Sequence, residues 1–204
     1  MRRAMLALAI TTILGACGPG AGPAAPSEAA AVTDWTLAPA ESRVAFASVK
    51  ADRVGEAHYF RELSGAVTAD GAFTLEIPLA SVETNIEIRN ERMRDMLFEV
   101  AQFPSAKLSG SVDLATLSGL AVGERTSASI PAELELHGVK TALDVPVFIT
   151  RISENRVAVE TSQPVLIEAG AFGLDAGLER LRTVANLPSI SPVAPVTASL
   201  VFER

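Results

Sequence analysis

Apolar and polar residues alternate one by one along six stretches of this chain, and no other feature constrains the fold as strongly. Val44 and Phe46 alternate with Arg43, Ala45 and Ala47. The same pattern recurs over residues 73–79, 130–137, 142–149, 156–161 and 196–203. Because successive residues of a β-strand point to opposite faces, each stretch predicts a strand with one apolar and one mostly polar face. Such strands are typical of antiparallel sheets with one side in water.

Turn residues separate these stretches, at Asp70-Gly71, His137-Gly138 and Ser153-Glu154-Asn155. Two further strands are predicted at about residues 59–69 and 104–114, which makes eight in an all-β fold. A closed antiparallel barrel would leave no strand edge unpaired. Eight strands also leave an interior just wide enough for a small ligand. A barrel or sandwich filled by its own side chains fits the pattern equally well.

One segment has helical rather than strand periodicity. Thr84-Asn85-Ile86-Glu87 has the S/T-x-x-E form of a helix capping box. Apolar residues then recur at helical spacing: Ile88, Met93, Met96, Leu97 and Val100. Phe103-Pro104 ends the pattern, because the residue before proline avoids the α region. The sequence therefore predicts a single inserted α-helix over about residues 85–100.

The chain begins with the layout of a secretory signal peptide. Arg2 and Arg3 precede an apolar run over residues 4–14, too short for the about 20 residues that span a bilayer. The next residues complete Leu14-Gly15-Ala16-Cys17, which is similar to a bacterial lipobox. This similarity implies cleavage before Cys17, the only cysteine, and acylation of that cysteine. The alternative is a chance cysteine inside an ordinary cleaved signal.

Two segments carry no periodic pattern. Residues 18–32 read GPGAGPAAPSEAAAV, too rich in small residues to bury a core, and we interpret them as a tether. Residues 179–195 contain Pro188, Pro192 and Pro195 and are predicted to form a loop beside the barrel mouth. The predicted organisation is a signal peptide over 1–16, a lipidated cysteine and tether over 17–33, and a barrel domain over 34–204.

Charge and composition narrow the choice of partners and location. Loss of residues 1–16 removes two arginines and changes the formal net charge from −7 to −9. Such acidity argues against nucleic acid as a partner, because phosphate binding needs clustered basic residues. It also leaves membrane attachment to the acyl anchor. Gly18 follows the cysteine, where aspartate commonly signals inner-membrane retention, so the outer membrane facing the periplasm is predicted.

Several motifs together resemble the YceI-like family. Ser81-Val82-Glu83-Thr84-Asn85, then Arg89 and Phe103-Pro104, resemble its S-V-x-T-N…R-D…H-L…(F/Y)-P stretch. Residues 132–140, AELELHGVK, resemble its G-x-L-x-L-x-G-V-T-K hairpin, and residues 42–46 and 171–174 resemble its opening strand and late F-x-I segment. The resemblance runs from about residue 35 to 203. This chain has Arg89-Asn90 where the family often has Arg-Asp, and Arg92-Met93 where it often has His-Leu.

The resemblance implies a lipocalin-like barrel that holds a polyisoprenoid or similar apolar chain. The predicted lining residues are Val44, Phe46, Phe73, Leu75, Met93, Leu97, Leu134, Leu136, Val145 and Val147. Apolar walls serve a packed core and a lipid tunnel equally well. Arg89 and Arg92, with Arg94 nearby, are candidates for binding a phosphate or carboxylate head group. Alternatively they pair with Glu91 and Asp95 on the helix surface.

The sequence offers no recognisable catalytic or metal-binding constellation. His58 and His137 each stand alone, and neither H-E-x-x-H nor G-x-S-x-G occurs. We therefore expect no enzyme, cofactor or metal. The function predicted first is a membrane-anchored periplasmic lipoprotein that binds or carries an apolar, isoprenoid-like chain. A ligand-free envelope interaction module and, less favoured, an enzyme acting on a small substrate stay open, as does a homodimer.

Overall fold

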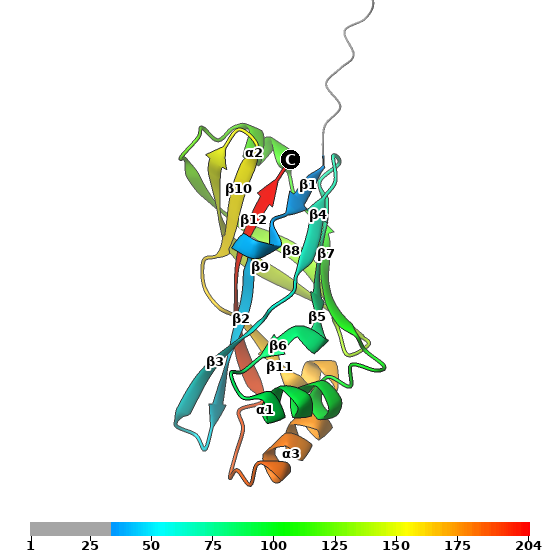
Figure 1. Cartoon of the computed structure of the whole chain (residues 1–204). Helices are drawn as coiled ribbons and strands as arrows, with labels where there is room; N and C mark the ends of the chain where they lie inside the picture. Colours follow the sequence, from blue (N-terminus) through cyan, green and yellow to red (C-terminus); the bar gives the residue numbers. More distant parts are fainter. Residues whose placement is uncertain (1–33) are drawn as a thin grey trace, which may run out of the picture. The chain divides into compact units, whose positions relative to one another are not determined.

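The computed structural model describes residues 34–204. Their strands, which differ in length, form one antiparallel sheet that closes into a barrel (Figure 1). The barrel strands are β1 (Trp35–Leu37), β4 (Ser64–Val67), β5 (Ala72–Pro78), β7 (Ser105–Ser111), β8 (Arg125–Leu136), β9 (Val139–Ser153), β10 (Arg156–Thr161) and β12 (Val193–Glu203). Each pairs with the next in that order, and β12 returns to β1 through Thr36 opposite Glu203 and Leu37 opposite Phe202. The predicted all-β, eight-stranded antiparallel barrel is confirmed.

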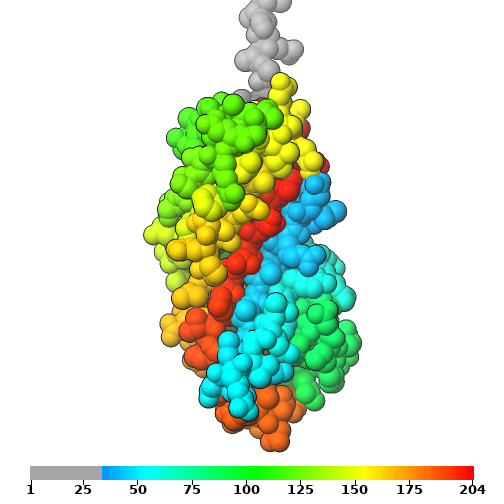
Figure 2. Space-filling model, turned by 90° about the vertical axis from the view of Figure 1, so that its left-hand side faces the viewer, coloured from blue at the N-terminus to red at the C-terminus, as the bar shows by residue number. Residues whose placement is uncertain are grey.

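Four further strands extend the barrel at one end. They are β2 (Arg43–Lys50), β3 (Val54–Phe60), β6 (Val82–Glu83) and β11 (Val165–Glu168). β2 follows β1 after the 3-10 turn η1 (Pro39–Glu41) and pairs with β12, while β11 pairs with the first residues of β12. β3 pairs with β2 on one side and β6 on the other. Figure 2 shows β12 as a diagonal red band between the yellow β10 and the blue β1 and β2.

The predicted helix is present but shorter and differently capped. It consists of α1 (Glu87–Arg92) and one π-helical turn, η3 (Met93–Leu97), so it ends well before Pro104. The predicted capping box is wrong, because Ile86 is the N-cap and makes no side-chain cap bond. Asn85 takes a left-handed conformation with φ of 61°, which turns the chain between Thr84 and the helix. The Thr84 hydroxyl contacts Asn90 Oδ1 at 2.6 Å and the Ile86 carbonyl at 3.3 Å, and it does not cap an N–H of the first helical turn.

The predicted loop over residues 179–195 is wrong at both ends, since α3 (Asp175–Val184) covers its first residues and β12 begins at Val193. Between these two elements, only residues 185–192 lack regular structure. A second unpredicted helix, α2 (Leu114–Ser118), starts where Asp113 accepts a hydrogen bond from the Ala115 N–H at 2.8 Å. The remaining short turns are η2 (Leu79–Ser81) and η4 (Ala169–Phe172). Within residues 34–204, no helix has the length and apolar character needed to cross a bilayer.

The barrel is packed at one end and hollow at the other. The packed end, near α2 in Figure 1, holds side chains that are at most 9 % exposed: Trp35, Leu37, Val157, Leu200 and Phe202. There the Phe73 ring packs against Gly110, where a Cβ would lie 2.7 Å from a ring carbon. The opposite end carries α1, α3 and the β2–β3 hairpin (Figure 1).

Candidate ligand cavity

A cavity of about 490 Å³ occupies the hollow end of the barrel. Its walls come from the inner faces of β2, β5, β7, β8, β9 and β12, and α1, η3 and α3 enclose it below. The cavity reaches the surface, because Ile86 and Ile88 line it while they are 46 % and 53 % exposed. The barrel therefore contains a mostly apolar chamber with a mouth beside α1.

The structure places eight of the ten predicted lining residues on this cavity: Val44, Phe46, Leu75, Met93, Leu97, Leu134, Leu136 and Val145. Phe73 and Val147 do not line it. Each lies two residues beyond a lining residue of its own strand, Leu75 and Val145, towards the packed end of the barrel. Their alternation pattern is correct, but the chamber stops short of them. A ligand-binding role for the other eight stays a prediction.

Part of the wall was not predicted from the sequence. Leu174, Leu178 and Leu181 bring α3 against the chamber, and Val165 and Ile167 of β11 line it beside β12. Leu174, Leu178 and Leu181 are spaced four and three residues apart, which is a helical pattern. This spacing could have predicted α3, but the prolines at 188, 192 and 195 led to the prediction of a loop.

The inner face of the β2–β3 hairpin changes from apolar to polar towards its tip. Phe46 lies opposite His58, and Ser48 lies opposite Glu56. His58 is 3 % exposed, and its Nε2 lies 2.9 Å from the Ser48 hydroxyl. Burial lowers the pKa of His58, and the positive charges of Arg89 and Lys50 lower it further, against an opposing effect of Glu56. The imidazole is therefore neutral at neutral pH.

Nearer the tip of the hairpin, the same wall carries the charged residues Lys50, Glu56 and Arg89. The Glu56 carboxylate lies 2.9 Å from Lys50 Nζ and 2.8 Å from Arg89 Nη1. Hydrogen bonding from Lys50 lowers the pKa of Glu56; burial opposes this effect, and the bond and charge of Arg89 reinforce it. Arg89 also donates from Nη2 to the Thr84 carbonyl at 2.6 Å. Three cavity-lining residues are thus joined in a fixed ion-pair network between the hairpin and α1.

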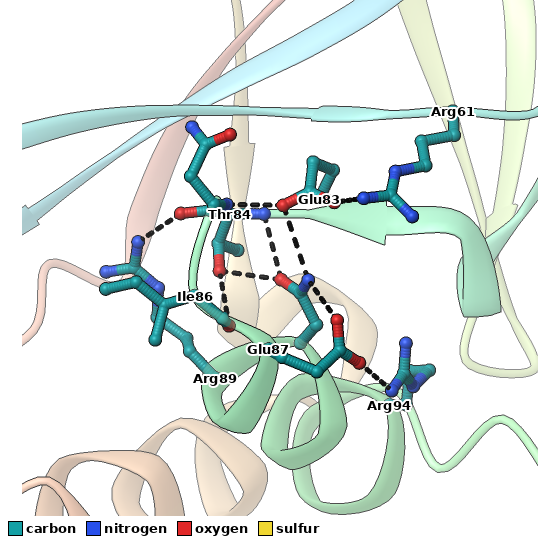
Figure 3. Close-up of polar contacts among 9 residues, drawn as sticks. Arg61, Glu83, Thr84, Ile86, Glu87, Arg89 and Arg94 are labelled. Atoms are coloured by element: carbon teal, nitrogen blue, oxygen red, sulfur yellow. Dashed lines mark hydrogen bonds and ion pairs between the residues drawn. The ribbon is translucent and has the colours of Figure 1, made fainter.

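A buried hydrogen-bond hub holds α1, and with it Arg89, in register with β6 (Figure 3). Glu83, Thr84 and Asn90 are at most 3 % exposed. Asn90 Oδ1 accepts from the Thr84 N–H and hydroxyl, while Asn90 Nδ2 donates to Glu83 Oε1 and Glu87 Oε2 at 3.4 Å each. Glu83 also accepts from the Asn85 N–H and pairs with Arg61. An asparagine supplies both the acceptor and the donors that this position uses.

The two predicted head-group residues both reach the cavity wall. Arg89 and Arg92 line the chamber, whereas Arg94 pairs with Glu87 at 2.8 Å outside it. Within the described part of the chain, the ion pairs of Arg89 and Arg94 involve Glu56 and Glu87, and the predicted partners Glu91 and Asp95 take no part in them.

The other sequence candidates lie apart from this site. His137 sits at the turn between β8 and β9, with Nε2 3.3 Å from Glu99. Among residues 34–204, no group of three or more potential metal-ligating side chains gathers. Cys17, the predicted lipidation site, and the signal and tether lie outside the described residues.

Comparison with known proteins agrees with the fold. A family model described as YceI-like domain matches residues 35–202. A polyisoprenoid binding domain from Saccharophagus degradans, implicated in plant cell wall breakdown, is 41 % identical, with a TM-score of 0.81. The alignment covers 83 % of this chain and 97 % of that one. No curated protein matches the chain.

More distant structures share the fold. BcnA from Burkholderia cenocepacia is 17 % identical over 81 % of this chain and 98 % of that one, with a TM-score of 0.64. A YceI protein of Campylobacter jejuni is 12 % identical over 72 % of this chain and 84 % of that one, with a TM-score of 0.54. On the family match over nearly the whole described domain, this chain belongs to the YceI-like domain family.

Proposed function

We propose that the protein is a lipid-anchored, periplasm-facing carrier that holds a polyisoprenoid or similar apolar chain inside its barrel. The observation that carries the proposal is the open cavity of about 490 Å³ at one end of an otherwise packed barrel. A purely structural core would be filled with side chains at the density of an organic crystal. The 41 % identical relative is described as a polyisoprenoid binding domain, which supports the ligand class.

Burial of the chain would supply the binding energy. Each methylene removed from water contributes about 0.8 kcal/mol. Leu134, Leu143 and Val145 offer apolar contacts on the barrel wall, while Arg89 and Arg92 line the chamber from α1. The chain would therefore lie along the barrel with its head group beside α1, as the predicted role of the two arginines requires.

The mouth offers an apolar route into the chamber. Ile86 and Ile88 continue the lining of the cavity onto the surface, and Val54 at the hairpin and Val184 at the end of α3 are 41 % and 42 % exposed. Exposed apolar groups at an opening provide an apolar path into the chamber beside the charged residues Lys50, Glu56 and Arg89. In Figure 1, β1, where the described domain begins, lies at the end opposite α1 and α3. The mouth thus opens away from the point where the predicted tether would join the domain.

The anchor is tested by its own experiment. Mass spectrometry of the N-terminal peptide should find Cys17 as its first residue, carrying acyl chains. Recovery of an unmodified Cys17 would contradict the anchoring part of the proposal.

The carrier function is tested by native mass spectrometry of the full chain after gentle extraction. A bound species with the mass of a prenyl chain should accompany the protein. As a control, Ala106→Phe places a ring on the inner face of β7 where Ala106 lines the chamber, and it should lose that species. A wild-type protein that is always empty would sink the carrier function and favour a ligand-free interaction module.

A further inference from the structure

Two buried nitrogen atoms of cavity-lining residues have no hydrogen-bond partner among residues 34–204. They are His58 Nδ1 and Arg89 Nε. Both residues line the cavity, and the His58 side chain is 3 % exposed. Buried polar groups in native proteins are almost always paired, so two orphans on one wall require an explanation. The other nitrogen atoms of both side chains make hydrogen bonds, so a misplaced side chain does not explain the two unpaired atoms.

The two residues belong to one cluster. Arg89 Nη1 binds Glu56 at 2.8 Å, and Glu56 lies two residues before His58 on the same inner face of β3. Nη2 donates to the Thr84 carbonyl, so Nε is the one nitrogen of the guanidinium that makes no hydrogen bond. His58 Nε2 is occupied by Ser48, so only Nδ1 of the imidazole is left.

The donor and acceptor types define what could fill the gap. An arginine Nε–H is a donor and never an acceptor. A neutral imidazole that shares one nitrogen with a hydroxyl can present its other nitrogen as either donor or acceptor, because the serine hydroxyl rotates to match. The complementary partner is an oxygen atom that accepts from Arg89 and either accepts from or donates to His58.

We propose that His58 Nδ1 and Arg89 Nε form a subsite that binds the head oxygen of the apolar chain, so that the protein selects oxygen-bearing lipids over plain hydrocarbons. The inference rests on the proposed function and adds His58, with Ser48 as its positioning partner, to the arginines already considered. The shared ligand chemistry is an acceptor oxygen on a prenyl-type chain, supplied by an alcohol or by a phosphate.

The test measures competition between three probes for the full chain: squalene, geranylgeraniol and geranylgeranyl phosphate. The wild type should bind both oxygenated probes more tightly than squalene. His58→Phe keeps a ring for the contact with Phe46 at 5.2 Å but removes both nitrogens. It should lower affinity for the oxygenated probes about tenfold, the effect of one lost buried hydrogen bond, and leave squalene unchanged.

Two further variants separate a specific role from a structural one. His58→Asn retains a hydrogen-bonding group near the position of Nδ1 and should restore part of the preference. His137→Asn alters the other histidine, which does not line the cavity, and should have no effect. If His58→Phe fails to fold, Ser48→Ala leaves the imidazole in place, removes its positioning partner and should still weaken the preference.

The outcomes distinguish this inference from the carrier function. If the wild type binds squalene as tightly as the oxygenated probes, or His58→Phe lowers all three affinities equally, the subsite is refuted and the carrier function stands. If no probe binds, both fall. A preference for phosphate over alcohol would identify the source of the oxygen as a charged head, and equal affinity would identify a neutral one.

Discussion

The side-chain oxygen of Asn90 accepts two hydrogen bonds from Thr84, one from the backbone N–H at 2.9 Å and one from the hydroxyl at 2.6 Å. Both residues are 2 % exposed. The pair ties the end of β6 to the middle of α1 and so sets where Arg89 meets the cavity. The hydrogen bonds around Asn90 therefore also fix the position of Arg89 in the candidate site.

Replacement of Asn90 should destabilise the protein. Asn90→Ala leaves the buried Thr84 N–H without an acceptor and leaves the hydroxyl only the Ile86 carbonyl at 3.3 Å, at a cost of about 1–3 kcal/mol in the free energy of unfolding. Asn90→Asp keeps the acceptor but loses both donors to Glu83 and Glu87 and adds a negative charge beside them. Thermal unfolding should show a fall of about 2–4 °C for each kcal/mol. Asn186→Asp, at an exposed position, is the matched control, and an equal fall there would contradict the explanation.

The alternation of apolar and polar residues predicted the barrel strands, because which side chains of a strand face inward follows from the sequence of that strand alone. Val44 and Phe46 face inward wherever β2 lies in the barrel, so the alternation assigned their face correctly. The pattern could not reveal where the chamber ends. Val145 and Val147 alternate identically, yet only Val145 lines the cavity. That distinction depends on which side chains converge from other strands.

Contacts distant in the sequence explain the parts that were missed. The spacing of Thr84 and Glu87 fits a capping box, but the left-handed Asn85 turns Thr84 away to Asn90. His58 appeared to stand alone because its neighbours come from β2 and from α1 across the cavity. Arg89 was found because a family motif marked it, whereas no local pattern marked His58.

Stability should fall as the pH drops below the ordinary histidine range. The folded protein holds His58 with a pKa below the usual 6.5, because of burial and the charges of Arg89 and Lys50. The unfolded chain therefore takes up a proton at this residue before the folded protein does, so acid favours unfolding from about pH 6.5 down to the folded pKa. Glu56, which opposes the shift, remains ionised there because its own pKa is lowered from 4.5.

Urea unfolding measured between pH 7.5 and 5 would check this prediction. The wild type should lose stability across that range, and His58→Phe should show a flatter profile. His137→Asn serves as the control and should keep the wild-type slope. A His58→Phe profile that is as steep as that of the wild type would show that another group causes the loss.

A bulky residue should be tolerated in the chamber and not where the chamber meets the packed part of the barrel. Ala106 and Ala132 are both buried on inner barrel faces, but only Ala106 lines the cavity. Ala106→Phe should fold normally and bind less ligand. Ala132→Phe, placed opposite Gly110 and Leu143, should cost about 1–3 kcal/mol through overpacking. Calorimetry and ligand titration of both variants check the contrast, and equal destabilisation would mean that the chamber collapses without ligand.

The close approach of α3 to η3 should control how long a ligand stays bound. A Cβ on Gly177 would lie 2.6 Å from the Met96 carbonyl oxygen and 2.9 Å from Leu97 Cα, both backbone atoms that cannot give way alone. Alanine normally favours a helix by about 1 kcal/mol over glycine, but here Gly177→Ala must push α3 away from η3. That shift would also lengthen the Arg180 contacts to Met96 and Glu99.

Gly177→Ala should therefore speed ligand dissociation and amide hydrogen exchange in α3 while the packed end of the barrel keeps its protection. Gly119→Ala is the matched control, since its Cβ would meet nothing closer than 3.5 Å, in ordinary contact at the end of α2. Stopped-flow displacement and hydrogen exchange measure the two effects. Faster exchange in α3 without faster dissociation would show that the ligand leaves past α1 and the hairpin, because the contact of α3 with η3 would then not limit its release.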